Sequence, residues 1–316
     1  MSSTSPLTAI FANIHLQLSR YVYCPLYIAG NLGNIFSLIM FSQAKLRSSG
    51  VCSWYFLVVS VANLISINTG FITRILSYMG FPDPSRTIGW YCTGRIYISN
   101  LSLTMARYFL CSIVIDRFLI TSTNVKFRRM SSFKVAKWYI PLSILGWMIY
   151  YSNIWVGYNG YQNGSACKRQ DGVYTIFITV NSLTIDTSIP ILLMTIFSLL
   201  TLNNLCGLRR RRNLITPHTD GSMMTVVRTT NRNETIDGGK QKMVVEQREK
   251  KQFGKQLTMI SLIQVLLYIM LNVLSAIYAL YSVITSSTIR TPNRTAIESF
   301  INAIAVMMTF IFGTVS

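Results

Sequence analysis

Three residues of one apolar segment have the types and spacing to do chemistry, an acid–base pair at one end and a thiol at the other. Asp116 and Arg117 are adjacent, and Cys92 stands 25 residues before Arg117. An α-helix covers that separation in about 37 Å. Such a helix reaches from one face of a membrane to the other and keeps both charges near water, where they are tolerated. The spacing therefore predicts an Asp–Arg pair at one surface of a membrane and a cysteine at the other.

A second charged pair is expected deeper in the membrane. Arg107 lies ten residues before Arg117, near the middle of the same predicted span, where an unpaired guanidinium is costly. Asp186 is the available acid on a neighbouring span, about one turn before Pro190. We expect an Arg107–Asp186 ion pair. The alternative is that Arg107 faces a water-filled cavity and binds an anionic group of a ligand.

Catalysis and metal binding are not expected. The two histidines, His15 and His218, lie in an N-terminal tail and a polar loop, and no acid cluster lies in the apolar segments. The six cysteines are too few and too scattered for a zinc site or a disulfide scaffold. The sequence therefore predicts no cofactor, no metal and no enzyme.

Long apolar segments position these residues. Of the 316 residues, 51% are hydrophobic and 12% charged, whereas about 25% of the residues of an ordinary soluble domain are charged. A helical span of the bilayer needs about 20 apolar residues. The predicted spans are 21–43, 53–77, 91–120, 136–158, 174–203, 256–285 and 297–316. We expect an all-α membrane protein, a seven-helix transmembrane bundle whose last helix is truncated at the end of the chain.

The net charge of +19 gathers in alternate loops, after the first, third and fifth predicted spans. Basic loops stay in the cytoplasm, which places the N-terminus outside. Residues 1–20 are then an extracellular tail. Residues 204–255, which are polar and lack apolar periodicity, are predicted to form a largely disordered third cytoplasmic loop. The charge is thus explained without nucleic acid as a partner. Sequons in the predicted outer loops make Asn163 and Asn293 expected glycosylation sites.

With these residues the chain resembles the rhodopsin-like (class A) G-protein-coupled receptors. Members of that family carry an Asp-Arg-Tyr-type triplet at the cytoplasmic end of the third helix and a cysteine at its outer end. Asp116-Arg117-Phe118 and Cys92 match this pattern, with Phe118 in place of the usual tyrosine. The resemblance implies a disulfide between Cys92 and Cys167, which is the one cysteine of the second outer loop.

Other spans carry both matches and departures. The first-helix asparagine and the fifth-helix proline of the family are present. An asparagine replaces the second-helix aspartate, and the sixth helix has neither the family's tryptophan nor its proline, which leaves a kink there without its usual cause. The matching positions are Asn34 and Pro190, the replacement is Asn63, and Tyr268 and Asn272 stand by register for the sixth helix's core aromatic residue and tryptophan.

The resemblance implies a multi-pass receptor of the plasma membrane that passes an extracellular signal to a heterotrimeric G protein. Asp116 would hold Arg117 at rest, and Arg117 would extend towards the G protein in the active state. Ser99 stands where amine receptors have an aspartate, and no lysine follows Lys255 to bind retinal. We instead expect a short peptide ligand. The polar and aromatic residues predicted for its pocket are Arg74, Arg95, Ser99, Tyr281 and Glu298.

Two other classes of protein stay open. A receptor-like protein that has lost signalling would account for the missing sixth-helix motif and the short C-terminus. A polytopic transporter would carry repeated halves or broken helices with paired charges inside the membrane, and no internal repeat is visible in the sequence. Ligand-independent coupling to a G protein separates a working receptor from the first alternative.

Overall fold

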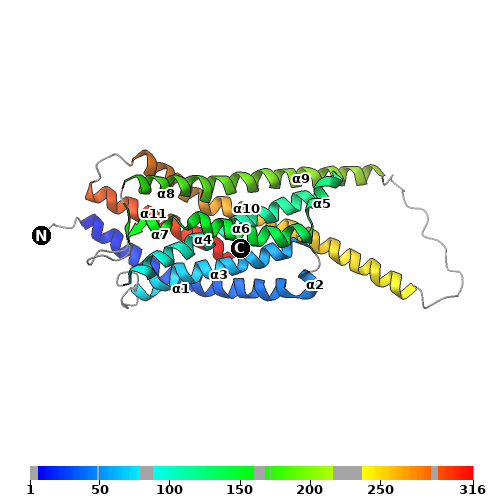
Figure 1. The fold of residues 1–316 in the computed structure, drawn as a ribbon, viewed down its shortest axis with the longest axis horizontal. Coiled ribbons are helices and arrows are strands. Elements are labelled where there is room, and N and C mark those ends of the chain that lie inside the picture. Colours follow the sequence, from blue (N-terminus) through cyan, green and yellow to red (C-terminus); the bar gives the residue numbers. More distant parts are fainter. Residues whose placement is uncertain are drawn as a thin grey trace.

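The computed structural model of the chain describes residues 6–47, 50–78, 88–159, 168–170, 172–215, 237–285 and 291–315. Nearly all of these residues lie in α-helices that run along one common direction (Figure 1). The short helices α2 and α5 lie at one end of the bundle, and α9 and α10 extend beyond the other helices at that same end (Figure 1).

The long helices are α1 (Pro6–Ser42), α3 (Cys52–Tyr78), α4 (Gly89–Thr121), α6 (Phe133–Tyr151), α8 (Val173–Leu183), α9 (Ile189–Ile215), α10 (Asp237–Ile284) and α11 (Pro292–Val315). Short helices are α2 (Ala44–Arg47), α5 (Val125–Met130) and α7 (Ile154–Gly157), and a π-helical segment, Thr184–Ser188, joins α8 to α9. Two-residue strands, β1 (Tyr158–Asn159) and β2 (Lys168–Arg169), pair antiparallel, with Tyr158 opposite Arg169.

Six helical stretches of the described residues are long and apolar enough to cross a membrane. They are Tyr21–Ser42, Cys52–Ile72, Gly89–Thr121, Val173–Gly207, Thr258–Ser282 and Asn293–Gly313. Large apolar side chains such as Leu32, Leu142 and Leu266 are exposed on the outside of the bundle, where acyl chains of a bilayer would surround them. The chain is therefore an all-α membrane protein with several crossings, as the sequence predicts.

The fourth predicted span, 136–158, falls on two helices and is not among these six. α6 has 19 residues, and the chain turns at Ser152 and Asn153 before the four residues of α7. The first turns of α6 contain Lys134 and Lys137, and its last turns contain tyrosines. These polar groups reduce the apolar character of a helix that is barely long enough to cross a membrane.

Helices also extend further than the sequence predicts at three points. α1 begins at Pro6, within the predicted tail 1–20. α9 continues to Ile215 and α10 begins at Asp237, so helix covers 204–215 and 237–255 of the predicted loop, whereas 216–236 lie outside the described residues. Segment 237–255 is rich in Gln, Glu, Lys and Arg. These residues favour a helix even where the segment has no apolar periodicity. Polar composition alone is thus a poor sign of disorder here.

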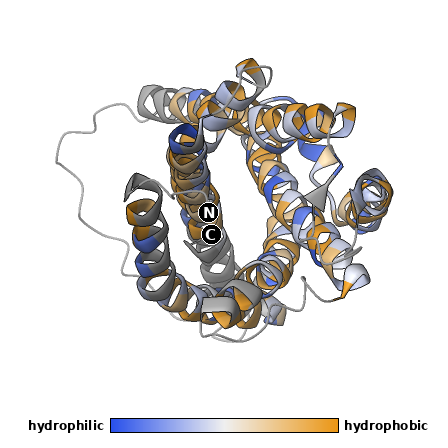
Figure 2. Ribbon diagram, turned by 90° about the vertical axis from the view of Figure 1, so that its left-hand side faces the viewer, coloured by the Kyte–Doolittle hydropathy of each residue, from blue (hydrophilic) through white to orange (hydrophobic). Residues whose placement is uncertain are grey.

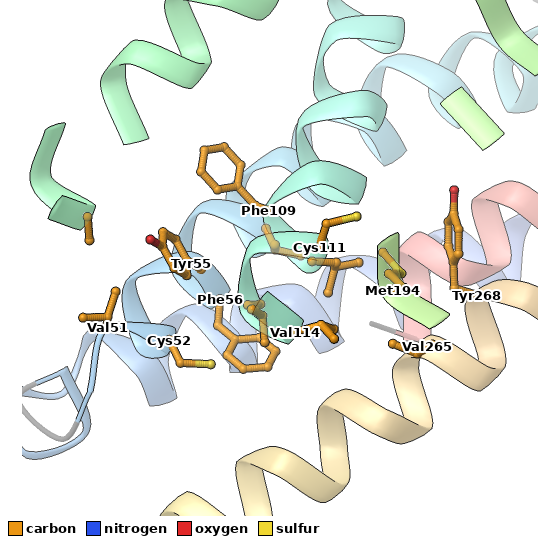
Figure 3. Close-up of a cluster of buried hydrophobic side chains, with 14 of the residues drawn as sticks. Val51, Cys52, Tyr55, Phe56, Phe109, Cys111, Val114, Met194, Val265 and Tyr268 are labelled. Atoms are coloured by element: carbon orange, nitrogen blue, oxygen red, sulfur yellow. The ribbon is translucent and has the colours of Figure 1, made fainter. Parts of the chain in front are cut away.

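Seen along their length, the helices lie side by side around a common centre and carry apolar residues (Figure 2). α4 contacts α3, α6, α9 and α10, α1 contacts both α3 and α11, and α11 contacts α10, which closes the ring. The main apolar core joins α3, α4, α9 and α10 (Figure 3), and its buried side chains include Phe56, Phe109, Val114, Met194 and Val265.

A second apolar cluster joins α1, α3 and α11 around Phe71 and Phe310. The two rings lie 4.9 Å apart between centroids. Gly70 permits this approach, since a Cβ atom at that position would lie 2.6 Å from the Phe310 ring. Glycine is therefore needed at position 70 for α3 and α11 to pack as they do.

Candidate functional site

Asp116 and Arg117 form an ion pair in the last two turns of α4. Arg117 Nη2 lies 3.0 Å from Asp116 Oδ2. Asp116 is only 3% exposed and Arg117 only 5%. The predicted pair therefore exists, and it is buried although it lies near a helix end. Burial strengthens the attraction between the two charges but also makes each charge costly if its partner is removed.

The second oxygen of the Asp116 carboxylate is held from another element. Ser131 follows α5, and its Oγ donates a hydrogen bond of 2.6 Å to Asp116 Oδ1. Arg117 and Ser131 thus occupy the two oxygens of one carboxylate. Ser131 is not predictable from the sequence, because a serine in a short polar loop carries no signal of its own.

Arg117 also lies next to the buried thiol of Cys52 on α3. The Nε atom of Arg117 is buried and has no hydrogen-bond partner among the described residues. Phe118, the third residue of the triplet, points elsewhere and packs against Phe127 of α5 and Phe197 of α9, with centroids 6.1 Å and 5.4 Å away. Phe118 thus joins α4 to two neighbouring helices, while Arg117 retains an unused donor.

Cys92 lies in the first turn of α4, at the opposite end of this 33-residue helix. It is fully buried and takes part in a disulfide. Its expected partner, Cys167, lies outside the described residues. The Cys92–Cys167 pairing therefore stays a prediction.

Arg107 and Asp186 meet in the middle of the bundle, both 7% exposed. Arg107 Nη1 donates to the backbone carbonyl of Asp186 at 2.9 Å and lies 3.9 Å from its carboxylate oxygen Oδ1. That carboxylate oxygen accepts shorter hydrogen bonds from Thr104 of α4 and Tyr151 of α6, both 2.7 Å. The predicted pair is present, but hydroxyl groups supply the closer contacts of the acid.

The backbone around Asp186 is π-helical, from Thr184 to Ser188. Pro190, four residues after Asp186, has no N–H with which to bind the Asp186 carbonyl in an α-helical register. That carbonyl accepts instead from Arg107 and, at 3.2 Å, from the hydroxyl of Tyr268 on α10. Single π-turns inside α-helices are frequent at functional sites. One carbonyl thus joins α4 and α10 to the α8–α9 pair.

Buried polar contacts continue towards α11. Asn272 is 1% exposed, donates to the Tyr268 carbonyl at 2.9 Å and accepts from Thr309 at 3.3 Å. Asn34 donates to the Gly313 carbonyl at 3.0 Å. Asn63 is buried beside the same turn, since a Cβ atom on Gly313 would lie 3.4 Å from Asn63 Oδ1. The predicted core polar residues therefore link α1 to α11 and α10 to α11.

Two neighbouring cavities of about 430 Å³ and 290 Å³ lie among α4, α8, α10 and α11. They share Asn100, Ser182, Asp186, Ser275 and Val306 in their walls. Of the predicted pocket residues, Arg95 and Ser99 line the smaller cavity, and Arg107 lines it as well. Hydroxyl and amide side chains dominate the larger one, namely Thr175, Thr179, Asn181, Tyr278, Ser282 and Asn302.

The other predicted pocket residues lie elsewhere. Tyr281 donates to the buried Glu298 carboxylate at 2.8 Å, and Arg294 binds the same oxygen at 2.7 Å. These three side chains form a cluster between α10 and α11 and are not among the residues lining either cavity. Arg294 is not among the residues predicted for a site, and its role here depends on how α10 meets α11. Arg74 lies in α3, and its side chain is outside the described part of the structure.

The two sequons differ in what the structure describes. Asn163 lies outside the described residues, whereas Asn293 is exposed in the first turn of α11. A larger hollow of about 780 Å³ lies between α3, α4 and α6, with a nearly all-apolar lining that includes Val61, Met105 and Ile144. Among the described residues, no group of three or more His, Cys, Asp or Glu side chains could hold a metal ion.

No protein-family model matches the chain, and no curated protein matches it. The features of the structure that bear on function are the paired charges at one end of α4, the carbonyl shared by α4 and α10, and the polar cavities that Asp186 lines.

Proposed function

We propose that this chain is a rhodopsin-like G-protein-coupled receptor of the plasma membrane. The buried Asp116–Arg117 pair at one end of a 33-residue helix, with Cys92 at the other end, carries the proposal. A buried ion pair adds little net stability because both charges must be desolvated. A switch gives a reason to keep it, since the carboxylate holds the guanidinium at rest and frees it for a partner on activation.

The proposed topology has seven crossings, with α6 as the fourth and the N-terminus outside. Exposed apolar side chains along α6, among them Leu142, Leu145 and Ile149, support a lipid-facing helix. α2, α5 and the extended ends of α9 and α10 lie at the same end of the bundle (Figure 1). Many of the chain's basic residues belong to these segments, which the positive-inside rule assigns to the cytoplasm.

A ligand bound in the polar cavities would act on α4, which carries the Asp116–Arg117 pair, and on α10. It would act on both helices through Asp186. Its side chain lines both cavities, and its carbonyl binds Arg107 of α4 and Tyr268 of α10. A ligand changes the equilibrium only if its contacts differ between two conformations. Contacts that move Asp186 meet this condition, because they alter the position of α10 relative to α4.

A short extracellular peptide is the ligand class that we favour. The larger cavity, about 430 Å³, offers hydroxyl and amide groups of six elements, α4, α6, β1, α8, α10 and α11. Such groups match the N–H and C=O groups of a peptide backbone. The volume accommodates one end of a peptide, while the rest of it would contact the outer ends of the helices.

Ligand-independent coupling tests the proposal without knowledge of the ligand. The full-length chain is expressed in cells with reporters for each class of G protein. Asp116→Asn removes the charge that holds Arg117, and we expect it to raise basal signalling several-fold. The matched control is Asp116→Asn combined with Arg117→Ala, which should return signalling to background. Equal signals from both variants with every reporter would contradict the proposal.

A screen of short peptides with a second-messenger readout then tests the ligand class. Ser275 lines both cavities, and Ser275→Phe should fill the space they share. We expect this variant to lose the peptide response while Asp116→Asn still raises its basal signalling. A peptide that activates the Ser275→Phe variant as well as the natural chain would place the binding site elsewhere.

A receptor-like protein that does not signal is the second candidate. Its support is α10, which runs unbroken over 48 residues with no proline or tryptophan in its sequence. Under this alternative α10 would be fixed in place. The same Asp116→Asn experiment decides between the two, because a fixed α10 predicts no coupling for any variant.

A further inference from the structure

The loop between α5 and α6 reaches the Asp116–Arg117 pair through a single hydroxyl group. Ser131 Oγ donates to Asp116 Oδ1 at 2.6 Å, while Arg117 Nη2 lies 3.0 Å from Asp116 Oδ2. Any group added to Ser131 Oγ therefore comes directly against this carboxylate and close to the guanidinium on its other oxygen.

The residues before Ser131 form a site that a protein kinase can recognise. Arg128 and Arg129 precede it by three and two residues and are exposed, as is Met130. A kinase with an acidic substrate groove binds arginines placed in this way by charge complementarity. α5 has only six residues, and a helix that short is marginally stable on its own. It can therefore unwind and enter an enzyme's groove.

We propose that Ser131 is a phosphorylation site and that its phosphate locks Arg117 in the resting state. A kinase transfers the γ-phosphoryl group of a nucleoside triphosphate to Ser131 Oγ. The new bond joins Oγ to phosphorus, and the bond from that phosphorus to the bridging oxygen breaks. The hydroxyl proton passes to a base of the kinase, and the nucleoside diphosphate leaves. The proposal rests on the proposed function for the cytoplasmic location of this loop.

The negative charge of the phosphate explains why it would favour the resting position of Arg117. A phosphoserine carries about −1.5 to −2 charges at neutral pH and strong acceptor oxygens. The phosphate removes the Ser131 hydrogen bond to Asp116 and repels that carboxylate. It also attracts Arg117, which then faces two anions in place of one. The proposed lock is that this attraction prevails, so that moving Arg117 away costs more free energy. Its buried Nε atom has no hydrogen-bond partner among the described residues and can donate to a phosphate oxygen. Hydrogen bonds between a guanidinium and a phosphate are among the strong ones in proteins.

Mass spectrometry of the full-length chain tests the site itself. The protein is purified from cells and also treated with an arginine-directed kinase and ATP. We expect phosphate on Ser131, loss of that phosphate in Ser131→Ala, and a large reduction in Arg128→Gln combined with Arg129→Gln. The matched control is Ser132→Asn, because Ser132 accepts a hydrogen bond from Val135 N at the start of α6 and asparagine retains that capping role. No phosphate on Ser131 in either preparation overturns the assignment.

Thermal unfolding of the purified protein tests the lock without any G protein. We expect the phosphorylated chain to unfold a few degrees higher than the same chain treated with phosphatase. The increase should disappear in Arg117→Gln and persist in Ser132→Asn. No increase, or the same increase in Arg117→Gln, overturns the lock. Because neither measurement uses a G protein, absence of coupling would count against the proposed function and leave these results standing.

Basal signalling distinguishes the switch from a purely structural hydroxyl. Ser131→Ala removes the hydrogen bond to Asp116 Oδ1 and should raise ligand-independent coupling. Ser131→Asp adds an anion beside Arg117 and should lower this coupling. A structural role of the hydroxyl predicts the same direction for both substitutions. Changes of the same sign would therefore refute the lock.

Discussion

Arg107 on α4 and Tyr268 on α10 donate hydrogen bonds to one and the same acceptor, the backbone carbonyl of Asp186, at 2.9 Å and 3.2 Å. The carbonyl is available because Pro190 has no N–H to offer it. Two helices that are far apart in the sequence are thereby connected by a single oxygen atom.

Charge pairing in the middle of the bundle can be tested with a double-mutant cycle. Arg107→Met leaves the Asp186 carboxylate without its counter-charge, and Asp186→Asn leaves the guanidinium without one. Each single substitution should cost about 3 kcal/mol, because an unpaired charge remains buried. The double variant should recover much of this loss. Thermal unfolding and surface expression measure it, and a double variant no better than the single variants would show that the two charges do not depend on each other.

The hydroxyl of Tyr268 should matter for signalling as well as for stability. Tyr268→Phe removes one hydrogen bond at a buried site and should cost about 1 kcal/mol. It also frees α10 from Asp186, so basal coupling should rise. Tyr108→Phe is the matched control, since Tyr108 donates to the Ile185 carbonyl at 2.9 Å from α4 and leaves α10 bound. Equal coupling in the two variants would remove the special role of Tyr268.

The cluster of Tyr281, Arg294 and Glu298, near the C-terminal end of α10, predicts that a second substitution restores stability lost through a first one. Arg294→Gln removes the positive charge that faces the Glu298 carboxylate, whose side chain is 7% exposed, and leaves Tyr281 bound to that carboxylate at 2.8 Å. We expect a lower unfolding temperature for this variant. Adding Glu298→Gln removes the buried charge and should restore most of the loss. If the combined variant is less stable than Arg294→Gln alone, the carboxylate is not the source of the cost.

Close packing of α3 against α11 makes Gly70 sensitive to a single methyl group. Gly70→Ala places a Cβ atom against the Phe310 ring, which is buried beside Phe71, and should cost about 1–3 kcal/mol. Gly146→Ala is the control, since nothing lies within 4 Å of a Cβ atom there and alanine favours a helix over glycine. Thermal unfolding should therefore move in opposite directions for the two variants.

The sequence predicts those features that depend on composition along one helix. Apolar runs of more than 20 residues identify six of the seven expected spans, because lipid requires a helix that is apolar on every side. The Arg107–Asp186 pair is predictable for a similar reason, since an arginine in mid-membrane needs an acid and few acids are available. Whether α6 crosses the membrane is ambiguous from its sequence. Its lysines and tyrosines lower the average hydropathy that its leucines and isoleucines raise.

Polar contacts between distant elements are not predictable in this way. Thr104, Tyr151 and Ser131 each complete the hydrogen bonding of an aspartate, yet isolated hydroxyl residues are common in helices and loops. Their role depends on a neighbour 15 to 82 residues away in the chain. Tyr281 and Glu298 were predicted to line a pocket, but their preference for each other and for Arg294 depends on how α10 meets α11.

The unbroken course of α10 has a mechanical consequence. From Tyr268 to its first residue, Asp237, the helix has no break, and at 1.5 Å per residue this arm is roughly 46 Å long. A tilt of roughly 10° about Tyr268 would displace the far tip by about 8 Å. A small tilt at the Tyr268 hydrogen bond is thus amplified at the far tip by leverage, and a kink would only shorten the arm.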